Sequence, residues 1–257
     1  MDELVATLRA ARHVAVMTGA GASAESGIPT FRDAMSGLWS RFDALELATP
    51  EAFARDPALV WGWYEWRRMM ALRAQPNAGH RAIAAMAAKV PRFTLITQNV
   101  DDLHERAGHD AVLHLHGSLH RPRCSVCALP HVSPPEIPAE PRNGRRLAPP
   151  ACHRCGGPVR PGVVWFGEIL PERTLRAAQL AAGECDVFFS VGTSSQVYPA
   201  AQLPQIAQHA GAVVVQVNPD RTALDDSARH NLRGQAGEIL PRLVRAAWGD
   251  EATAAAS

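Results

Sequence analysis

Four of the five cysteines stand in two pairs whose spacing is typical of a metal site. Cys124 and Cys127 form one Cys-x-x-Cys pair, and Cys152 and Cys155 form the other. Thiolates at this spacing hold Zn²⁺ in a tetrahedral site, and four protein ligands leave no position open for a reacting water. We therefore predict one structural zinc ion.

Glycines and polar side chains follow each of five short apolar runs. The runs are VAVMTG from Val14, FTLITQ from Phe93, VLHLHG from Val112, VFFSVG from Val187 and VVVQVN from Val213. Their β-branched and aromatic residues predict buried strands. Ligands of a parallel sheet bind at the carboxyl ends of its strands. The segments TGAGAS, TQNVDD, LHGS, VGTSS and VNPD should therefore meet in one crevice.

Segments with helical periodicity lie between several of these runs, for example HRAIAAMAAKV and ERTLRAAQLAAG. The alternation predicts an α/β protein with a doubly wound parallel (Rossmann-like) sheet that is covered on both faces. Two stretches interrupt the alternation: a helical insertion at residues 34–75, and a zinc-ribbon insertion at residues 119–167. We expect them to form a smaller module, with residues 1–33, 76–118 and 168–257 forming the main domain.

The composition argues against several kinds of partner and mechanism. The chain has 257 residues, of which 47% are hydrophobic and 20% are charged, and its formal net charge is +1. Such a charge attracts neither nucleic acid nor an anionic membrane. The only lysine is Lys89, which argues against a P-loop or a Schiff base. No signal peptide or membrane span is evident, so the protein is expected to be cytoplasmic.

Arginines flank the cysteine pairs, so nucleic-acid binding by a zinc ribbon is a second interpretation of this region. They are Arg121, Arg123, Arg145 and Arg146. The nearly neutral chain and the lack of interleaved aromatic residues argue against this interpretation. We expect instead that the ribbon lies beside the main domain and that the substrate enters between them.

A glycine-rich string follows the first predicted strand. It consists of Gly19, Ala20, Gly21, Ala22, Ser23 and Ala24, and it lacks the third glycine of the dehydrogenase fingerprint. Taken alone, a tight turn is its simpler interpretation, although glycines also let a backbone approach a phosphate. The longer string GAGASAESGIPTFRD, however, resembles the NAD-binding signature of the sirtuins.

The resemblance to the sirtuins recurs in the same order along nearly the whole chain. It includes TQNVDDLHERAG from Thr97, HGS from His116, the two cysteine pairs, VVWFGEILP from Val163, GTSS from Gly192 and VNP from Val217. Within the family the chain is most similar to the class III deacylases, because it carries Tyr64-x-x-Arg67 and VVWFGE. It departs from the family at Ala22, where Ile or Val is common, and this change would loosen packing beneath the cofactor.

The resemblance implies a protein-lysine deacylase that consumes NAD and releases nicotinamide and 2′-O-acyl-ADP-ribose. Besides the glycine-rich string, it implies cofactor contacts from Phe31, Arg32, Gln98, Asn99, Asp101, Gly192, Thr193, Ser194, Asn218 and Ala236. Phe31 would cover the reacting ribose, and Arg32 would lie near the phosphates or the ribose. Asp101 would suit the carboxamide of nicotinamide, and Asn99 a water or a ribose hydroxyl.

His116 is the expected general base, and Asn99 is the second expected catalytic residue. In the sirtuin scheme a histidine helps to deprotonate the ribose 2′-hydroxyl, which suits a group that titrates near neutral pH. His114 shares a strand face with His116 and is the alternative. We favour His116 because Gly117 and Ser118 follow it, as in the family string, and because it lies nearer the carboxyl end of the strand.

Tyr64 and Arg67 are expected to select the acyl group. Three residues apart on a helix, they project from one face, and a phenol with a guanidinium matches the oxygens of a carboxylate. Malonyl, succinyl and glutaryl groups end in a carboxylate, whereas acetyl does not. The alternative is that Tyr64 packs in a tryptophan-rich core and Arg67 is solvated. The resemblance also implies a strand that binds the acyl-lysine peptide, formed by Val164, Trp165, Phe166, Gly167 and Glu168.

Two other functions remain open. An enzyme of the same family could be a plain deacetylase or a mono-ADP-ribosyltransferase, and the Tyr64 and Arg67 pair discriminates against both. A chain that only binds NAD and zinc would release no nicotinamide. The presence of His116, Asn99 and Asp101 argues against such a binding module.

Overall fold

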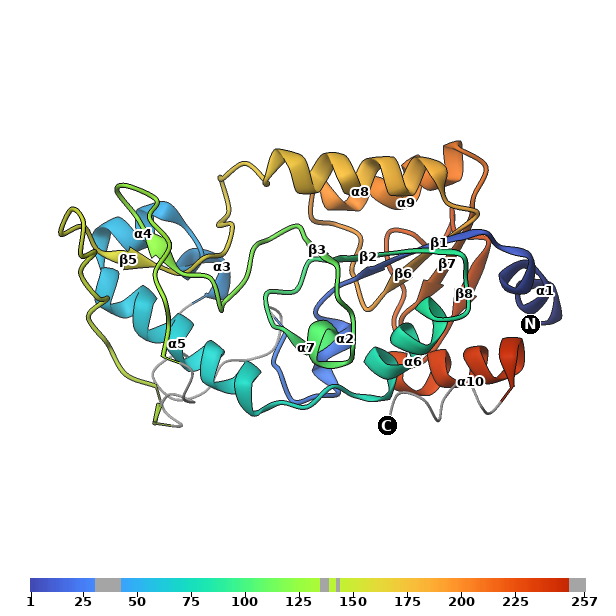
Figure 1. The fold of residues 1–257 in the computed structure, drawn as a ribbon, viewed down its shortest axis with the longest axis horizontal. Coiled ribbons are helices and arrows are strands. Elements are labelled where there is room, and N and C mark those ends of the chain that lie inside the picture. Colours follow the sequence, from blue (N-terminus) through green and yellow to red (C-terminus); the bar gives the residue numbers. More distant parts are fainter. Residues whose placement is uncertain (31–42, 135–138, 142–143, 250–257) are drawn as a thin grey trace.

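A six-stranded parallel sheet is the centre of the computed structural model, which describes residues 1–30, 43–134, 139–141 and 144–249 (Figure 1). The strands are β1 (His13–Thr18), β2 (Arg92–Thr97), β3 (Val112–His114), β6 (Val187–Val191), β7 (Val213–Val217) and β8 (His230–Leu232). Every neighbouring pair is parallel. The predicted parallel sheet is therefore confirmed.

The strand order reverses between β1 and β6. The order across the sheet is β3-β2-β1-β6-β7-β8, so the chain first moves outward from β1 and later returns to its other side. Sheets of this kind bind ligands at such a switch point, outside the carboxyl ends of the strands. The segments that follow β1 and β6 are therefore where we look for a site.

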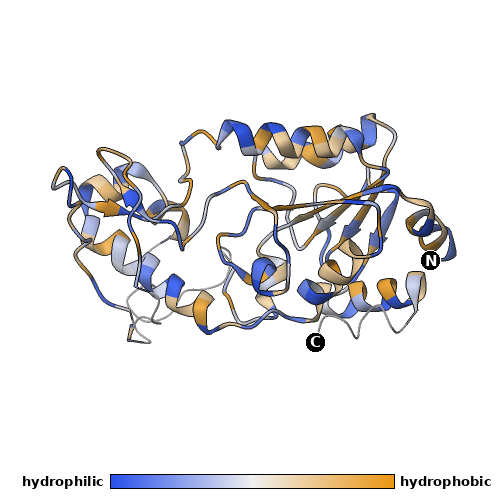
Figure 2. Cartoon of the chain, in the orientation of Figure 1, coloured by the Kyte–Doolittle hydropathy of each residue, from blue (hydrophilic) through white to orange (hydrophobic). Residues whose placement is uncertain are grey.

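Two layers of helices cover the sheet. One layer contains α1 (Asp2–Ala10), α6 (Ala78–Ala87) and α10 (Ala236–Trp248). The other contains α8 (Glu172–Glu184), η2 (Ala200–Gln202) and α9 (Leu203–His209). Val14 and Val16 face the first layer and Ala15 and Met17 face the second, because alternate strand residues point to opposite sides. Figure 2 shows polar and apolar residues alternating along α8 and α10, as amphipathic helices require.

A second lobe lies beside the sheet (Figure 1). Its elements are α3 (Ala44–Leu47), α4 (Pro50–Arg55), α5 (Pro57–Arg73) and the antiparallel strands β4 (Arg123–Cys124) and β5 (Val159–Arg160). The side chain of Asp56 caps α5 by accepting a hydrogen bond from the Leu59 N–H at 3.1 Å. A Cβ added at Gly62 of α5 would lie 2.2 Å from the carbonyl oxygen of Arg145, so the helix packs directly on the zinc-ribbon region.

A short helix follows each of the strands β1 and β2. These helices are α2 (Gly21–Ala24), which follows β1, and α7 (Leu103–Arg106), which follows β2. In the second lobe, Trp61, Trp63 and Trp66 are all buried. None of the described helices is both long and apolar enough to cross a membrane.

The structure departs from the predicted strands at three places. The run from Val112 forms a strand only as far as His114, so His116 lies in the turn beyond β3 and does not share a strand face with His114. The structure also contains β8, which was not predicted because its three residues do not form an apolar run. It has no continuous strand at residues 164–168, where the nearest pairing is an isolated bridge between Gly117 and Val163. The domain boundaries stay a prediction.

The cap of α6 buries a histidine. The Asn77 side chain accepts hydrogen bonds from the N–H groups of Gly79 and His80, and the Asn77 N–H donates to His80 Nδ1. His80 is only 1% exposed. Burial, assisted by the nearby charges of His109 and Arg81, lowers the pKa of His80 to about 4.

Acid is therefore expected to destabilise the fold through His80. The unfolded chain, with a histidine pKa of 6.5, binds more protons than the folded chain as the pH falls toward 4. The free energy of unfolding should decrease by about 2 kcal/mol between pH 7 and pH 5 through this residue. Urea unfolding of wild type and of His80→Leu, each at pH 7 and pH 5, separates the contribution of His80 to this decrease from that of cysteine protonation. Equal pH dependence in the two proteins would contradict the prediction.

Candidate active site at the switch point of the sheet

Three glycines lock the segments after β1 and β6 together. The Gly21 N–H donates to the Gly192 carbonyl oxygen at 2.9 Å, and the Gly19 N–H donates to Val191 at 2.9 Å. A Cβ on Gly19 would lie 2.8 Å from the Gly192 oxygen, and a Cβ on Gly21 would lie 2.8 Å from the Cα of Gly192. Gly192 itself has a φ of 60°. The glycines are therefore required by the contact between these two segments.

Polar side chains connect the ends of β2, β6 and β7. Gln98 donates from Nε2 to Thr193 Oγ1 at 3.3 Å, and Asn218 donates from Nδ2 to the Thr193 carbonyl oxygen at 3.0 Å. Ser194 follows Thr193 on the same loop and is half-buried. Thr193, Ser194 and Asn218, which are expected to contact the cofactor, thus lie together at the carboxyl edge of the sheet.

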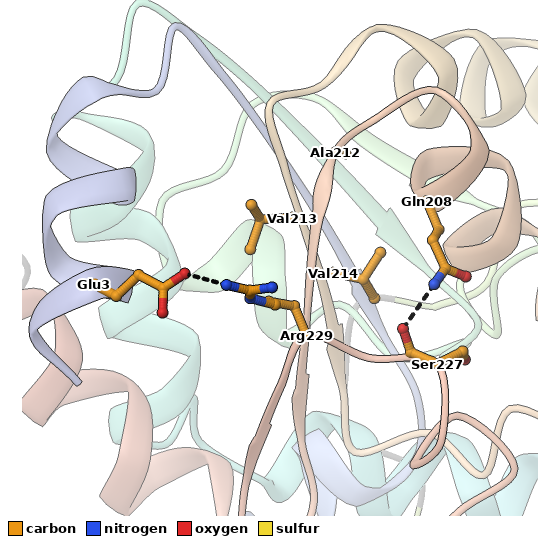
Figure 3. A pocket seen from close by; sticks show the side chains of 7 residues that line it. All are labelled: Glu3, Gln208, Ala212, Val213, Val214, Ser227 and Arg229. Atoms are coloured by element: carbon orange, nitrogen blue, oxygen red, sulfur yellow. Dashed lines mark hydrogen bonds and ion pairs between the residues drawn. The ribbon is translucent and has the colours of Figure 1, made fainter.

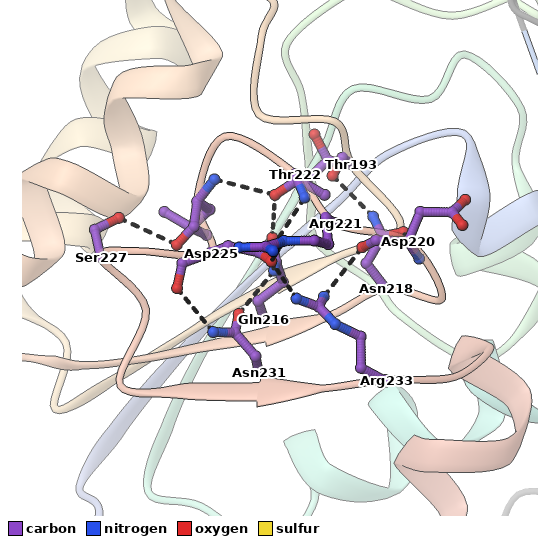
Figure 4. Close-up of polar contacts among 11 residues, drawn as sticks. Thr193, Gln216, Asn218, Asp220, Arg221, Thr222, Asp225, Ser227, Asn231 and Arg233 are labelled. Carbon is purple, nitrogen blue, oxygen red and sulfur yellow. Dashed lines mark hydrogen bonds and ion pairs between the residues drawn. The ribbon is translucent and has the colours of Figure 1, made fainter.

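The segment after β7 is held by a polar network around Asp225 (Figure 4). The Asp225 carboxylate accepts hydrogen bonds from the Thr222 N–H at 3.0 Å and from Gln216 Nε2 at 2.7 Å, and it pairs with Arg221 and Arg233. The Thr222 N–H and the Arg233 guanidinium hold the pKa of this carboxyl below its usual range. Because Gln216 lies on buried β7, the network anchors the loop that begins just after this strand.

Ala236 lies behind the glycine-rich string, at the first residue of α10. The next residue, Gly237, donates its N–H to the carboxylate of Glu25 at 2.9 Å. Ala236 also packs on Gly79, where an added Cβ would lie 3.1 Å from it. Ala22 is buried in the same core, so the alanine that stands where Ile or Val is common is enclosed by other side chains. Phe31 and Arg32 lie outside the described residues.

His116 has a single tautomer. Its Nδ1 lies 3.0 Å from the carbonyl oxygen of Gln98. A carbonyl can only accept a hydrogen bond, so Nδ1 carries the proton and Nε2 of the neutral ring is left with a lone pair. Burial lowers the pKa of His116 below 6.5, which keeps the ring neutral at pH 7. No described residue bonds Nε2, so this nitrogen can take a proton from a ligand.

His114 is in a different state. Its Nε2 lies 2.7 Å from the Glu105 carboxylate and its Nδ1 lies 3.3 Å from the Asn99 carbonyl oxygen. Burial alone would lower the pKa of His114, but the Glu105 carboxylate more than offsets it and the pKa is raised. Both ring nitrogens therefore donate to acceptors within the protein, which leaves His114 poorly suited to act as a base.

Asn99 and Asp101 are both buried, and the Ser23 hydroxyl lies beside each of them. Asn99 donates from Nδ2 to Ser23 Oγ at 3.0 Å, which leaves its Oδ1 as an acceptor. Burial raises the pKa of Asp101, and the Leu103 N–H and the Ser23 hydroxyl offset this only in part. The two residues are 7% and 6% exposed, so a ligand there would be largely shielded from water.

Tyr64 and Arg67 lie one turn apart on α5. Tyr64 is 3% exposed, and its hydroxyl oxygen accepts a hydrogen bond from Trp165 Nε1 at 3.0 Å. Burial raises the pKa of Tyr64, and the charge of Arg67 opposes this increase. The Arg67 guanidinium lies 5.1 Å from the centre of the Trp63 ring. Tyr64 packs among aromatic rings, as the alternative interpretation suggested, yet its hydroxyl proton can still be donated.

The segment expected to bind a peptide already uses its N–H groups. Val164 donates to the His116 carbonyl oxygen at 2.8 Å, and Phe166 donates to that of Ala48 at 2.9 Å. Trp165 donates from its N–H to the Glu168 carboxylate at 2.8 Å. Glu168 also pairs with Arg160 at 2.6 Å. Main-chain pairing with a peptide would therefore use other groups, such as Gly167 and the carbonyl oxygens.

The four paired cysteines converge on one point between β4 and β5. Their sulfur atoms all lie within 4.8 Å of one another. Cys124 and Cys155 are 3.4 Å apart, and Cys127 and Cys152 are 3.7 Å apart. Tetrahedral zinc with bonds of about 2.3 Å places sulfurs about 3.8 Å apart, which fits these distances. The N–H groups of Cys127 and Val126 lower the pKa of Cys124 to about 6 and favour the thiolate.

We expect purified protein to contain about one zinc ion per chain. Because the metal joins residues on both sides of a long loop, a strong chelator should unfold the ribbon and thereby abolish activity. Metal analysis and circular dichroism before and after chelation test this. Folded, active protein that contains no zinc would contradict it.

Two of the arginines near the cysteines are engaged in ion pairs. Arg145 pairs with Glu140 at 2.8 Å, and Arg146 pairs with Asp56.

A pocket of about 310 Å³ lies at the opposite, amino-terminal end of β7 (Figure 3). It is lined by Glu3, Gln208, Ala212, Val213, Val214, Ser227 and Arg229. Glu3 and Arg229 pair across it at 2.8 Å. We assign it no part in the site, because it is separated from Asn218 by the length of the strand.

Three polar residues that support the site were given no role from the sequence, although all three lie in strings that pointed to the site. Thr18 and Thr97 are the last residues of β1 and β2, and His104 lies on α7 beside them. The signal that could have found the threonines is a polar residue at the end of each apolar run. His104 gives no such signal, because a histidine in a helix is ordinary.

Comparison with known proteins gives one family. The Sir2 family model matches residues 19–199. The NAD-dependent protein deacylase of Methylococcus capsulatus is 64% identical over 245 residues, which cover 95% of this chain and 96% of that protein. NAD-dependent protein deacylase 1 of Pseudomonas aeruginosa is 58% identical over 248 residues, which cover 96% of this chain and 99% of that protein.

Solved structures agree with these relatives. A Sir2 homologue solved with NAD has a TM-score of 0.86 at 45% identity, and the match covers 100% of this chain and 95% of that chain. A Sir2 protein solved with a deacetylated p53 peptide and 3′-O-acetyl-ADP-ribose has a TM-score of 0.83 at 30% identity, over 97% and 98% of the two chains. With the fold, the strand-end motifs and these relatives in agreement, the chain belongs to the Sir2 family, and the resemblance to the sirtuins is confirmed.

Proposed function

We propose that this chain, which is an NAD-dependent protein deacylase of the Sir2 family, removes negatively charged acyl groups from lysine: succinyl, malonyl and, as a longer member of the class, glutaryl. Relatives named NAD-dependent protein deacylase and a homologue solved with NAD support the general activity. The single observation that carries the deacylase activity is the tautomer of His116, whose Nε2 can take a proton at the carboxyl edge of the sheet.

The roles of the site residues follow from their donors and acceptors. NAD supplies a ribose whose bond to nicotinamide breaks as the acyl oxygen of the lysine bonds to C1′. Nε2 of His116 would then hold the proton that the ribose 2′-hydroxyl loses. Oδ1 of Asn99 would accept from a water or a hydroxyl, and Asp101 would accept from the nicotinamide carboxamide. Burial of this pair would keep water from the reacting carbon.

The acyl preference is supported by Tyr64 and Arg67. The Tyr64 oxygen accepts from Trp165, so the hydroxyl proton is available to donate to a ligand. Burial raises the pKa of Tyr64, which keeps the phenol protonated and able to donate. A carboxylate at the end of an acyl chain would accept from this hydroxyl and pair with the Arg67 guanidinium. An acetyl group offers neither contact.

Incubation with NAD and four peptides that differ only in the lysine acyl group tests the proposal. The groups are acetyl, malonyl, succinyl and glutaryl, and mass spectrometry measures nicotinamide and acyl-ADP-ribose. We expect acyl-ADP-ribose to form fastest from the acidic groups. A plain deacetylase would prefer acetyl, and an ADP-ribosyltransferase would attach ADP-ribose to protein. A binding module would release no nicotinamide.

A further inference from the structure

A line of hydrogen bonds runs from α7 to the backbone of Asn99. His104 Nε2 lies 2.8 Å from Thr18 Oγ1, and Thr18 Oγ1 donates to Thr97 Oγ1 at 2.8 Å. Thr97 Oγ1 in turn accepts the Asn99 N–H at 3.0 Å. His104 is 2% exposed and the two threonines are 0% exposed, so water cannot replace any of these bonds easily.

The direction of these bonds fixes the tautomer of His104. A hydroxyl has one proton, and Thr18 gives it to Thr97. The Thr18 oxygen must therefore accept from His104, which places the ring proton on Nε2. His104 Nδ1 is buried and has no hydrogen-bond partner in the described part of the chain. Burial, with His80 and His109 nearby, keeps the pKa of His104 well below 6.5, so the ring stays neutral.

These residues stand where the site is assembled. Thr18 and Thr97 pair in the register of β1 and β2, directly before the glycine-rich string and before Gln98. The Gln98 carbonyl oxygen is the group that sets the tautomer of His116. The hydrogen bonds therefore act on the two backbone segments that carry the proposed base and Asn99.

A metal site is the competing interpretation of the buried histidines. The ring centres of His80 and His104 are 4.8 Å apart, and those of His104 and His109 are 5.9 Å apart. Among the residues that the structure describes, however, only the four cysteines bring three or more ligand atoms close enough for one ion. The histidine rings pack on one another without a shared metal position.

We propose that His104 is a positioning residue for the deacylase reaction: by donating to Thr18 it orients the Thr18–Thr97 pair, which fixes the backbone of Asn99. The inference rests on the proposed function, because the expected loss of turnover arises where that site would hold the ribose. His104 itself touches no reacting atom. Its loss should therefore lower turnover by misplacing Asn99 and leave substrate affinity largely intact.

Two substitutions separate the hydrogen bond from packing. Gln can place a donor near the position of Nε2, whereas Leu fills the space without a donor. We expect His104→Leu to lower kcat by about 10- to 100-fold, a size typical of an error of about 1 Å in a catalytic group. The KM for the acyl peptide should change by less than about 3-fold. His104→Gln should restore most of the turnover.

His109→Leu is the matched control. His109 contacts the His104 ring and is buried, but it takes no part in the line of hydrogen bonds. Its substitution should lower Tm to a similar extent as His104→Leu and leave kcat unchanged. Equal loss of kcat in His109→Leu, or no restoration in His104→Gln, would overturn the proposal.

A double-mutant cycle with Thr18→Val tests whether His104 acts through this line of hydrogen bonds. If His104 acts through Thr18, the double variant should lose little more turnover than either single variant, whereas additive losses would contradict this. Hydrogen exchange at the Asn99 amide needs no turnover, and it should become faster in His104→Leu but not in His104→Gln. Wild-type protein that deacylates no peptide would refute the proposed function, and the exchange rates would still decide whether His104 positions Asn99.

Discussion

His116→Ala is expected to remove most deacylation and to leave folding and NAD binding largely intact. The side chain makes one hydrogen bond in the described structure, from Nδ1 to the Gln98 carbonyl oxygen, so few structural contacts are lost. A general base contributes about 10²- to 10⁴-fold, and kcat should fall by that amount. Steady-state turnover of a succinyl peptide, with calorimetry of NAD binding, measures the two effects separately.

His114→Ala is the matched control, because the same residue type is removed two positions away. His114 donates to Glu105 and to the Asn99 carbonyl oxygen, so its loss should reduce stability more than chemistry. We expect a much smaller decrease in kcat than for His116→Ala. An essential His114 with a dispensable His116 would show that the base has been assigned to the wrong residue.

The pH dependence of turnover provides a second test of His116. Burial lowers its pKa, and the base acts only when Nε2 is unprotonated. Turnover should therefore stay constant as the pH falls to about 6.5 and decline below it. His114 would behave differently, since the Glu105 carboxylate raises its pKa and would move the decline to higher pH. A decline above the ordinary histidine range would thus favour His114.

Features carried by local patterns could be predicted from the sequence. The strands that begin near Val14, Phe93, Val187 and Val213 are apolar runs, and the composition of each run indicates burial. The cysteine set needs only the spacing of its pairs. β8 could not be found this way, because it is stabilised by pairing with β7 at the edge of the sheet.

Features that depend on contacts between distant segments could not be predicted. Gly19 and Gly21 are expected from the resemblance to contact the cofactor, and the structure adds a second reason for glycine that the sequence does not show, because Gly192 lies against both. His114 and His116 have the same side chain two positions apart, His114 at the end of β3 and His116 in the turn that follows it. What separates their chemistry is the Glu105 carboxylate beside one ring and a backbone carbonyl beside the other.

Arg67→Met is expected to separate acyl classes through a single charge. If Arg67 pairs with the distal carboxylate of a succinyl group, Met keeps much of the volume but leaves that carboxylate without its partner. The loss should be about 2–4 kcal/mol for a partly buried pair. Turnover of succinyl peptide at low concentration should then fall by roughly thirty-fold to several hundred-fold. Turnover of acetyl peptide should hold steady or rise, because acetyl never used the guanidinium.

Tyr64→Phe should move selectivity in the same direction by a smaller amount, about 0.5–1.5 kcal/mol. It also leaves the buried Trp165 Nε1 without its acceptor, so we expect a lower Tm in this variant. That loss of stability affects both peptides equally, and for this reason the measured quantity is the ratio of kcat/KM for succinyl over acetyl peptide. An unchanged ratio in Arg67→Met would mean that Arg67 does not contact the acyl group. The preference for negatively charged acyl groups would then be abandoned in favour of plain deacetylation.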